Sequence, residues 1–373
     1  MLAFLGLIFL LYGGMHGYAL GKVWQAFPHS AALGVALALW GFLMTFSPLA
    51  IWYVAKQGRH GAATSLSWVA SIWMGYLFLF CCIALTLDIT HMLAMFAGFK
   101  WFLAGWDALA AVALPALALA AYAAMEARRI RVDELKITTP KLASGRVTIA
   151  QISDLHLGMM LGDSFLQRVV EILREASPGV IVATGDVIDG EGDNLAELAP
   201  HFRKLSPPNG LYAILGNHEN FAGMGKSLRF LQDAGFTVLR GEYVPVEGII
   251  LAGVDDRTLG NHAREMSEDK RQALAAARND TFIILLKHQP VVGNDIPFDL
   301  QLSGHAHGGQ IFPFGLFTLL TYGVRAGLYR YSDGRTLYVN RGTGTWGPPM
   351  RLFVPPEITL ITIESENNRD ARQ

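Results

Sequence analysis

Hydrophobic and polar positions divide the chain into two parts of different character. The first 125 residues contain only six of the charged types Lys, Arg, Asp and Glu, namely Lys22, Lys56, Arg59, Asp88, Lys100 and Asp107. Four apolar runs in this part are each long enough to cross a bilayer, because about 20 helical residues cover roughly 30 Å. We place these predicted transmembrane helices near residues 1–20, 31–55, 65–87 and 102–125.

Basic residues in the short loops predict the orientation of these helices, since cytoplasmic loops are enriched in Lys and Arg. The loops on one side contain Lys56, Arg59, Arg128, Arg129 and Arg131. The other side contains only Lys22 and Lys100. We therefore expect a multi-pass membrane protein, of the inner membrane if the chain is bacterial, with the domain after residue 125 on the cytoplasmic side. A cleavable signal peptide is the alternative for the first run, but that run lacks a basic start.

The rest of the composition limits the compartment and the partners. The two cysteines, Cys81 and Cys82, are adjacent within an apolar run, and the polar part of the chain has none, which fits a reducing compartment. The formal net charge is −1 without a long basic run, so no nucleic-acid partner is expected. The lipid bilayer is the expected partner, and the composition leaves the oligomeric state open. We interpret the helical region as an anchor, with a ligand-sensing role as the alternative.

After a polar connector at 126–145, the pattern changes to short strands and helices. Predicted strands cover 146–152, 180–183, 211–215, 237–239, 243–246, 249–254 and 281–287. Predicted helices cover 164–176, 196–204, 226–233 and 263–277, and 300–363 is expected to be mostly strand and turn. This order predicts two sheets packed together with helices outside, as one domain at 146–365 followed by a disordered tail at 366–373.

Metal-ligand side chains follow several of these strands. They are Asp154, His156, Asp186, Asn217, His288, His305 and His307, the last two within the segment Ser-Gly-His-Ala-His-Gly-Gly-Gln at 303–310. Open sheets place their ligands at the carboxyl ends of strands, so residues distant in sequence can share one site. Taken singly, each has a structural explanation, such as a helix cap or a hydrogen-bonded core histidine. Together and in this order they indicate a metal site.

The ligand types predict the metals and the reaction. Seven ligands suit two divalent cations if Asp186 bridges them, and a mixture of carboxylate and imidazole favours Mn, Fe or Zn over Mg or Ca. Two such cations can activate a water as a hydroxide and clamp a phosphoryl group. His218 is the candidate acid for the leaving group, and Asp189 is positioned to orient it.

The ordered blocks Asp154-Leu-His156, Gly185-Asp186-Val-Ile-Asp189, Gly216-Asn217-His218-Glu219, His288 and Gly304-His305-Ala-His307 resemble the calcineurin-like metallophosphoesterase superfamily over about 147–363. The tail Asn340-Arg341-Gly342-Thr343-Gly344 with Pro356-Glu357-Ile358 is similar to the membrane-associated YkuE/YaeI type, and the four-helix start to transmembrane proteins with a metallophosphoesterase domain. The resemblance implies a four-layer α/β/β/α sandwich of two mixed sheets and a dinuclear site. It further implies that Asp154, His156, Asp186 and His307 bind one metal, and that Asp186, Asn217, His288 and His305 bind the other. His218 then corresponds to the catalytic histidine and Asp189 to its partner.

The sequence thus predicts a membrane-anchored, metal-dependent phosphoesterase that hydrolyses a phosphodiester or pyrophosphate, either lipid-linked or nucleotide-linked. The alternative is a non-catalytic metal-binding scaffold or sensor. The apolar stretch at 311–322 bears on the substrate. It is either a buried strand of the second sheet or an apolar lip beside the metals that admits an acyl chain. Arg325 and Arg341 are either contacts for a second phosphate or structural.

Overall fold

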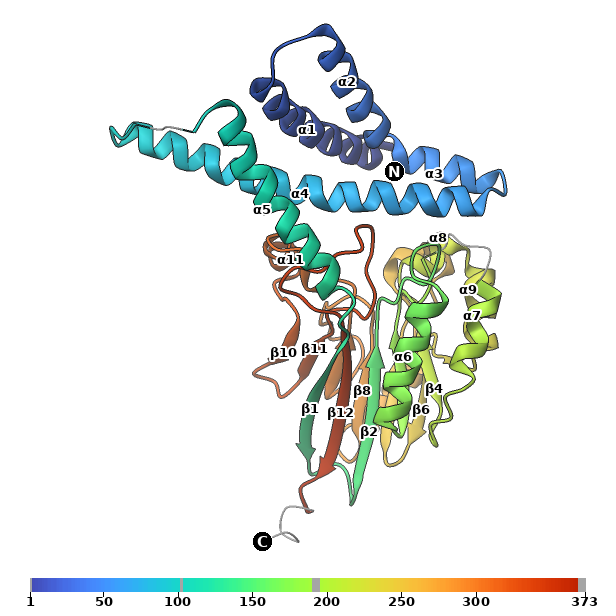
Figure 1. The fold of residues 1–373 in the computed structure, drawn as a ribbon. Coiled ribbons are helices and arrows are strands. Elements are labelled where there is room, and N and C mark those ends of the chain that lie inside the picture. Colours follow the sequence, from blue (N-terminus) through green and yellow to red (C-terminus); the bar gives the residue numbers. More distant parts are fainter. Residues whose placement is uncertain (1, 101–102, 190–194, 368–373) are drawn as a thin grey trace. The chain divides into compact units, whose positions relative to one another are not determined.

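A computed structural model describes residues 2–100, 103–189 and 195–367 (Figure 1). The chain divides into two compact units, and each is considered by itself. The first consists of Met1–Glu126 with Gly347–Leu352, and the second of Ala127–Trp346 with Phe353–Gln373. Residues 368–373 of the predicted tail lie outside the described residues.

The first unit is helical. Its helices are α1 (Leu2–Ala26), α2 (Ala31–Thr45), α3 (Ser47–Lys56), α4 (His60–Phe96) and α5 (Gly105–Glu126). The hydroxyl of Ser30 accepts the amide of Leu33 at 3.2 Å and caps the start of α2. A bend of 56° separates α2 from α3. Pro48 lies in the first turn of α3, where its missing N–H costs least, so this predicted span is broken rather than straight.

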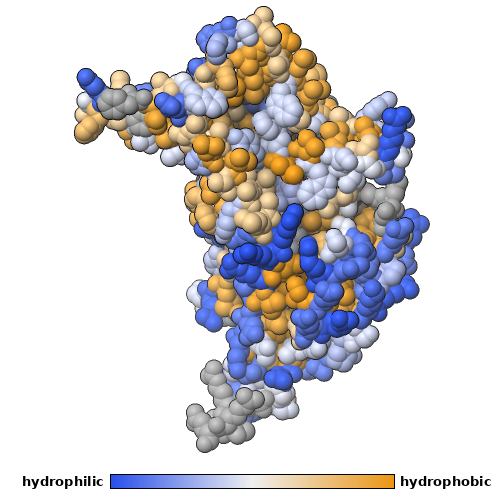
Figure 2. Space-filling view, viewed as in Figure 1, coloured by the Kyte–Doolittle hydropathy of each residue, from blue (hydrophilic) through white to orange (hydrophobic). Residues whose placement is uncertain are grey.

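The number of membrane spans differs from the sequence prediction. Among the described residues, α4 and α5 are long and apolar enough to cross a bilayer, and α2 with α3 makes a third if the bent pair is one span. Large apolar side chains such as Leu39, Leu93 and Leu114 are exposed on this unit, and Figure 2 shows its apolar surface. Four spans and their orientation therefore stay predictions.

Polar side chains inside the helical unit have partners. Lys22 donates to Asp88 at 2.5 Å, and the Tyr18 hydroxyl donates to the same carboxylate at 2.6 Å. The indole of Trp73 donates to Nε2 of His16 at 2.8 Å. Charges in an apolar region are tolerated when they are paired in this way. These residues therefore fit a packing role within the helical unit.

The second unit contains two mixed sheets. The first has the order β1-β12-β2-β3-β4-β5, with β1 (Arg131–Thr139), β12 (Glu357–Ser365), β2 (Arg146–Ile152), β3 (Val180–Thr184), β4 (Leu211–Ile214) and β5 (Thr237–Val238). The second has the order β10-β11-β9-β8-β7-β6, with β10 (Gly327–Arg330), β11 (Thr336–Val339), β9 (Leu300–Ser303), β8 (Phe282–Leu286), β7 (Ile249–Gly253) and β6 (Glu242–Val246).

Helices and short turns connect the strands. They are α6 (Asp163–Ala176), α7 (Leu195–Phe202), α8 (His218–Ala222), α9 (Met224–Asp233), α10 (Glu268–Ala277), α11 (Gly315–Tyr322) and the 3-10 turns η1 (Arg257–His262) and η2 (His307–Gly309). One apolar core joins the two sheets, for example Val182 of β3 and Ile284 of β8. Another joins the first sheet to α6, α7 and α9, and a third lies against α10. β3 and β8 are buried along their whole length, because each has an apolar core on both of its faces.

Two sequence predictions for this unit were wrong, and one of the two alternatives for a third segment is excluded. The connector at 126–145 contains β1, which pairs in parallel with β12, because Val132, Leu135 and Ile137 give this polar segment enough apolar positions for an edge strand. The helix predicted at 263–277 begins only at Glu268, after the η1 turn. The apolar stretch at 311–322 is no strand of the second sheet but contains α11.

Candidate metal centre

The candidate site lies where the strands of both sheets end. Asp154, Asp186 and Asn217 follow β2, β3 and β4, which are parallel neighbours in the first sheet. His288 and His305 follow β8 and β9, which are parallel neighbours in the second. Adjacent parallel strands bring their carboxyl ends to one edge, so the two sheets supply ligands to the same place.

One group of ligand atoms is formed by Asp154, His156 and His307. Nε2 of His156 lies 3.0 Å from Nε2 of His307, and the latter lies 3.4 Å from Oδ1 of Asp154. One ligand atom from each of the three residues lies within 4.8 Å of the others. All three side chains are buried.

A second group surrounds Nε2 of His288. This atom lies 3.1 Å from Oδ2 of Asp186, 3.1 Å from Nδ1 of His305 and 3.2 Å from Oδ1 of Asn217. Oδ2 of Asp186 is also 4.0 Å from Nε2 of His156, which belongs to the first group. Asp186 therefore lies between the two groups, where a bridging ligand would lie.

The donor atoms fit divalent cations. Nδ1 of His288 donates to the carbonyl of Thr184 at 2.8 Å. In the neutral ring the Nε2 lone pair therefore faces the acceptor oxygens of Asp186 and Asn217, which a cation would reconcile. Burial of Asp186 opposes its ionisation, but His288 outweighs that and the pKa of the carboxyl falls well below its usual range. Burial likewise opposes protonation of His288, but Asp186 outweighs it and raises the pKa of the imidazole to about 10. The carboxylates thus demand positive charge at this point, and a bound cation would supply it.

Asp189 and His218 lie beside the first group. Nδ1 of His218 is 2.7 Å from Oδ1 of Asp189, and Nδ1 of His156 is 3.3 Å from the same oxygen. Burial would raise the pKa of Asp189, but its contacts with His156 and His218 lower it. An ionised Asp189 can hold the Nδ1 proton of His218 and leave Nε2 for a substrate. All nine predicted site residues thus lie within one cluster.

The local backbone is shaped around the ligands. Asp154, His156, Asp186, His305 and His307 all have positive φ, between 48° and 67°. Such conformations cost of order 1–3 kcal/mol for residues other than glycine and are found at functional sites. Gly216 and Gly304 precede ligands because a Cβ at either position would collide with the carboxylate of Asp186 or Asp154.

Glu219 is a buried residue to which the sequence analysis gave no role. Its carboxylate accepts the amides of Gly216 and Val187 at 2.7 Å and of Asp186 at 3.0 Å. It thereby fixes the loop that presents Asp186 to the loop that presents Asn217. Burial and the neighbouring charge of Asp186 raise the pKa of Glu219. Its position directly after Asn217-His218 is the only signal that sequence offered.

The tail motif supports the loop of Asp154. Thr343 donates its amide to the carbonyl of Ser153 at 2.7 Å, and Gly344 donates to that of Asp154 at 2.9 Å. The guanidinium of Arg341 contacts Glu357 at 2.8 Å and Asp133 at 2.5 Å. Of the two interpretations of Arg341, the structure therefore favours the structural one.

Tyr322, at the end of α11, also contacts the cluster. Its hydroxyl lies 2.7 Å from Nε2 of His305, whose Nδ1 faces His288. A hydrogen bond at one ring nitrogen fixes the tautomer and the orientation of a ligand histidine. The apolar sequence around Tyr322 concealed this role.

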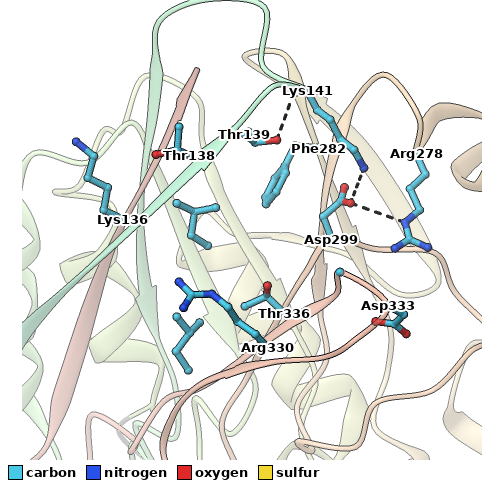
Figure 3. Close-up of a pocket in the computed structure, with 13 residues that line it drawn as sticks. Lys136, Thr138, Thr139, Lys141, Arg278, Phe282, Asp299, Arg330, Asp333 and Thr336 are labelled. Atoms are coloured by element: carbon cyan, nitrogen blue, oxygen red, sulfur yellow. Dashed lines mark hydrogen bonds and ion pairs between the residues drawn. The ribbon is translucent and has the colours of Figure 1, made fainter. Parts of the chain in front are cut away.

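A separate cavity of about 640 Å³ lies at the other end of the strands, where β8 and β11 begin with Phe282 and Thr336 (Figure 3). Two of its basic side chains share one carboxylate, because Asp299 contacts Lys141 at 2.6 Å and Arg278 at 3.8 Å. This cavity contains none of the predicted site residues, so the ligand cluster and not the cavity is the candidate active site.

Comparison with known proteins identifies the family of this chain. The family model of calcineurin-like phosphoesterases matches residues 147–309. An "uncharacterized metallophosphoesterase" of Aquifex aeolicus is 38% identical over 258 residues, which are 68% of this chain and 99% of that protein. The metallophosphoesterase YkuE of Bacillus subtilis is 36% identical over 287 residues, covering 72% and 98% of the two chains. This chain therefore belongs to the calcineurin-like metallophosphoesterase family, as its motifs indicated.

A relative named as a transmembrane protein is also similar. The "transmembrane protein with metallophosphoesterase domain" of Danio rerio is 33% identical over 252 residues, which are 63% of this chain and 57% of that protein. The chain thus spans little more than half of the Danio rerio protein.

Removal of the Glu219 carboxylate should destabilise the second unit. Glu219→Ala leaves several buried amides without an acceptor and should cost about 3–5 kcal/mol. Glu219→Gln keeps one oxygen and should cost less. Thermal melting of the full-length protein in detergent measures both, with the exposed Glu171→Ala as the control. Equal melting temperatures for Glu219→Ala and Glu171→Ala would contradict this role.

Loss of the Tyr322 hydroxyl should weaken metal binding. Tyr322→Phe releases Nε2 of His305 and should lower Mn affinity about 10- to 100-fold, the usual effect of losing an outer partner of a ligand. Equilibrium dialysis with Mn measures this affinity. Tyr329→Phe is the matched control, since its hydroxyl also takes part in a hydrogen bond, here accepting the amide of Arg325 at 2.8 Å, and contacts no metal-ligand residue in the described structure. Unchanged affinity in Tyr322→Phe would show that the contact is incidental.

Proposed function

We propose that the protein is a membrane-anchored phosphoesterase with two divalent metals that hydrolyses a phosphodiester or a pyrophosphate. The position of Asp186 carries this proposal, because its Oδ2 is 3.1 Å from Nε2 of His288 and 4.0 Å from Nε2 of His156. One carboxylate can therefore serve both ligand groups. The four-layer sandwich implied by the family is the framework that we expect around them.

Each residue has a role in this proposal. Asp154, His156, Asp186 and His307 would hold one cation, and Asp186, Asn217, His288 and His305 the other. Mn, Fe or Zn fits this mixture of carboxylate, amide and imidazole ligands. When bound, the pair of metals would activate water and stabilise charge on the phosphoryl oxygens.

The protein's own acid would act on the leaving group. His218 is oriented by Asp189 at 2.7 Å, which keeps a proton on Nδ1 and leaves Nε2 to protonate the departing oxygen. A scaffold without catalysis has no use for this pair. We therefore favour the enzyme over the non-catalytic alternative.

An apolar lip supports a lipid-linked substrate, with a nucleotide-linked one as the alternative. We define the lip as residues 311–322, which contain no charged side chain. Phe317 and Leu320 are 60% and 85% exposed, although burying such side chains is favourable by about 1.5–3 kcal/mol each. Tyr322 links this lip to His305. An acyl chain or the bilayer surface is the environment that would cover it, on the cytoplasmic side if the predicted orientation holds.

Variants of the ligands and of the acid should fail in different ways. Asp186→Asn or His307→Ala should lose bound Mn and hydrolysis of bis-p-nitrophenyl phosphate. His218→Ala should keep Mn but lose about 10²- to 10⁴-fold in kcat for a phenyl ester, and less for a nitrophenyl ester, whose leaving group needs no acid. Metal analysis and steady-state kinetics separate these effects.

The control for these variants is the exposed His262→Ala, which should match the wild type. Wild-type turnover in His307→Ala would refute the assigned site. Loss of Mn in His218→Ala would assign that residue to the ligands.

Contact between the lip and lipid can be tested by photo-crosslinking. The full-length protein, with Leu320 replaced by benzoyl-phenylalanine, should form adducts with phospholipid when it is illuminated in nanodiscs. The same replacement of Val291, which is 44% exposed and outside the lip, should give few. Adducts at position 320 that contain only protein would contradict a lip that faces lipid.

A further inference from the structure

Two exposed aromatic side chains flank His218. The ring of Phe221 lies 5.3 Å from the imidazole of His218, centroid to centroid, with an interplanar angle of 84°. The ring of Trp346 lies 5.6 Å from the same imidazole at 72°. Phe221 is 71% exposed and Trp346 is 55% exposed. The candidate acid thus lies between two large apolar surfaces that remain accessible.

The metal-ligand loop fixes the position of Trp346. Gln310 follows His307 by three residues and is buried. Its side chain accepts the amide of Trp346 and donates to the carbonyl of Trp346, both at 2.9 Å. This pair of hydrogen bonds holds the backbone of Trp346 in register with His307. Gln310, the last residue of the segment 303–310, therefore holds the backbone of Trp346 rather than that of a metal ligand.

Phe221 is positioned by the same elements as the candidate acid. It lies one helical turn after His218 in α8. Glu219 in the same turn holds the Asp186 loop, and the hydroxyl of Ser227 donates to the carbonyl of Glu219 at 2.8 Å. These bonds hold the backbone of α8, which carries both His218 and Phe221. The backbone that carries each ring is thus held by hydrogen bonds, although neither ring is part of the core.

Neither exposed ring belongs to the buried core of the second unit. Isolated exposed aromatic residues are common and need no explanation. Here, however, hydrogen bonds order Trp346 beside a titratable side chain, and its indole remains more than half exposed. Aromatic side chains that remain accessible in this way can stack against a flat group such as a base.

We infer that Phe221 and Trp346 form the subsite for the leaving group, and that this group is apolar or aromatic. The inference rests on the proposed function, in which His218 protonates the leaving oxygen. During hydrolysis the bond from phosphorus to that oxygen breaks, a bond to the oxygen of water forms, and the proton of His218 moves to the leaving oxygen. The released group then lies against the two rings. A nucleobase and an acyl chain both provide this chemistry.

Direct binding tests the subsite without requiring turnover. Adenosine monophosphate, dodecyl phosphate below its micelle concentration, and inorganic phosphate should be titrated into Mn-loaded full-length protein by calorimetry. We expect one of the two esters to bind at least tenfold more tightly than phosphate. Trp346→Ala and Phe221→Ala should each raise the Kd of that ester about tenfold and leave the Kd of phosphate unchanged. Trp346→Phe should retain most of the affinity, and the exposed Val291→Ala is the control.

The outcomes separate the subsite from the metal site. Tighter binding of adenosine monophosphate assigns the rings to a base, and tighter binding of dodecyl phosphate assigns them to an acyl chain. Esters that bind no better than phosphate, or a Trp346→Ala variant with wild-type affinity for both esters, would overturn the inference. Failure of the wild type to bind phosphate while Mn is bound would instead count against the proposed function.

Discussion

The second unit depends on the concentration of polar ligands within a small buried volume. Two aspartates, an asparagine and four histidines meet at the ends of two sheets, and the nearest of their nitrogen and oxygen atoms are about 3 Å apart. Without compensating positive charge, buried carboxylates and facing imidazoles are unfavourable. The raised pKa of His288 and the lowered pKa of Asp186 express this demand for a cation. Metal binding and folding of this edge are thus expected to be coupled.

Residues that never contact a substrate make this arrangement stable. Glu219 accepts amides from the loops that present Asp186 and Asn217, and Thr343 joins the tail to Ser153. These bonds hold ligands whose backbones lie in the left-handed region, where most residues are unfavourable. The motif residues other than the ligands therefore act chiefly as supports. Glycines precede Asn217 and His305 because a Cβ at Gly216 or Gly304 would collide with the carboxylate of Asp186 or Asp154.

The chemistry and the selectivity belong to different parts of the site. In the proposed function, the residues that would hold the metals and His218 account for cleavage of a phosphoester. Two exposed apolar surfaces lie beside these residues. Phe221 and Trp346 lie near His218. Helix α11 contacts His305 through Tyr322. Both surfaces favour a substrate with a substantial apolar part. If the enzyme is anchored in a membrane, as proposed, it would meet such an apolar substrate at the surface of that membrane.

The sequence by itself determined the division into an apolar and a polar part, the family, and the nine residues of the cluster, because strand ends marked by Asp, Asn and His are local signals. It predicted β2 closely, since seven residues with a regular pattern need no distant partner to be recognised. Only the tertiary structure assigned β1 to the first sheet, because its pairing with β12 joins residues more than 200 positions apart. Likewise, only the tertiary structure revealed the contact of Tyr322 with His305 and the hydrogen bond from the Gln310 side chain to Trp346. Contacts between separate loops produce no periodic pattern in the sequence from which they could be predicted.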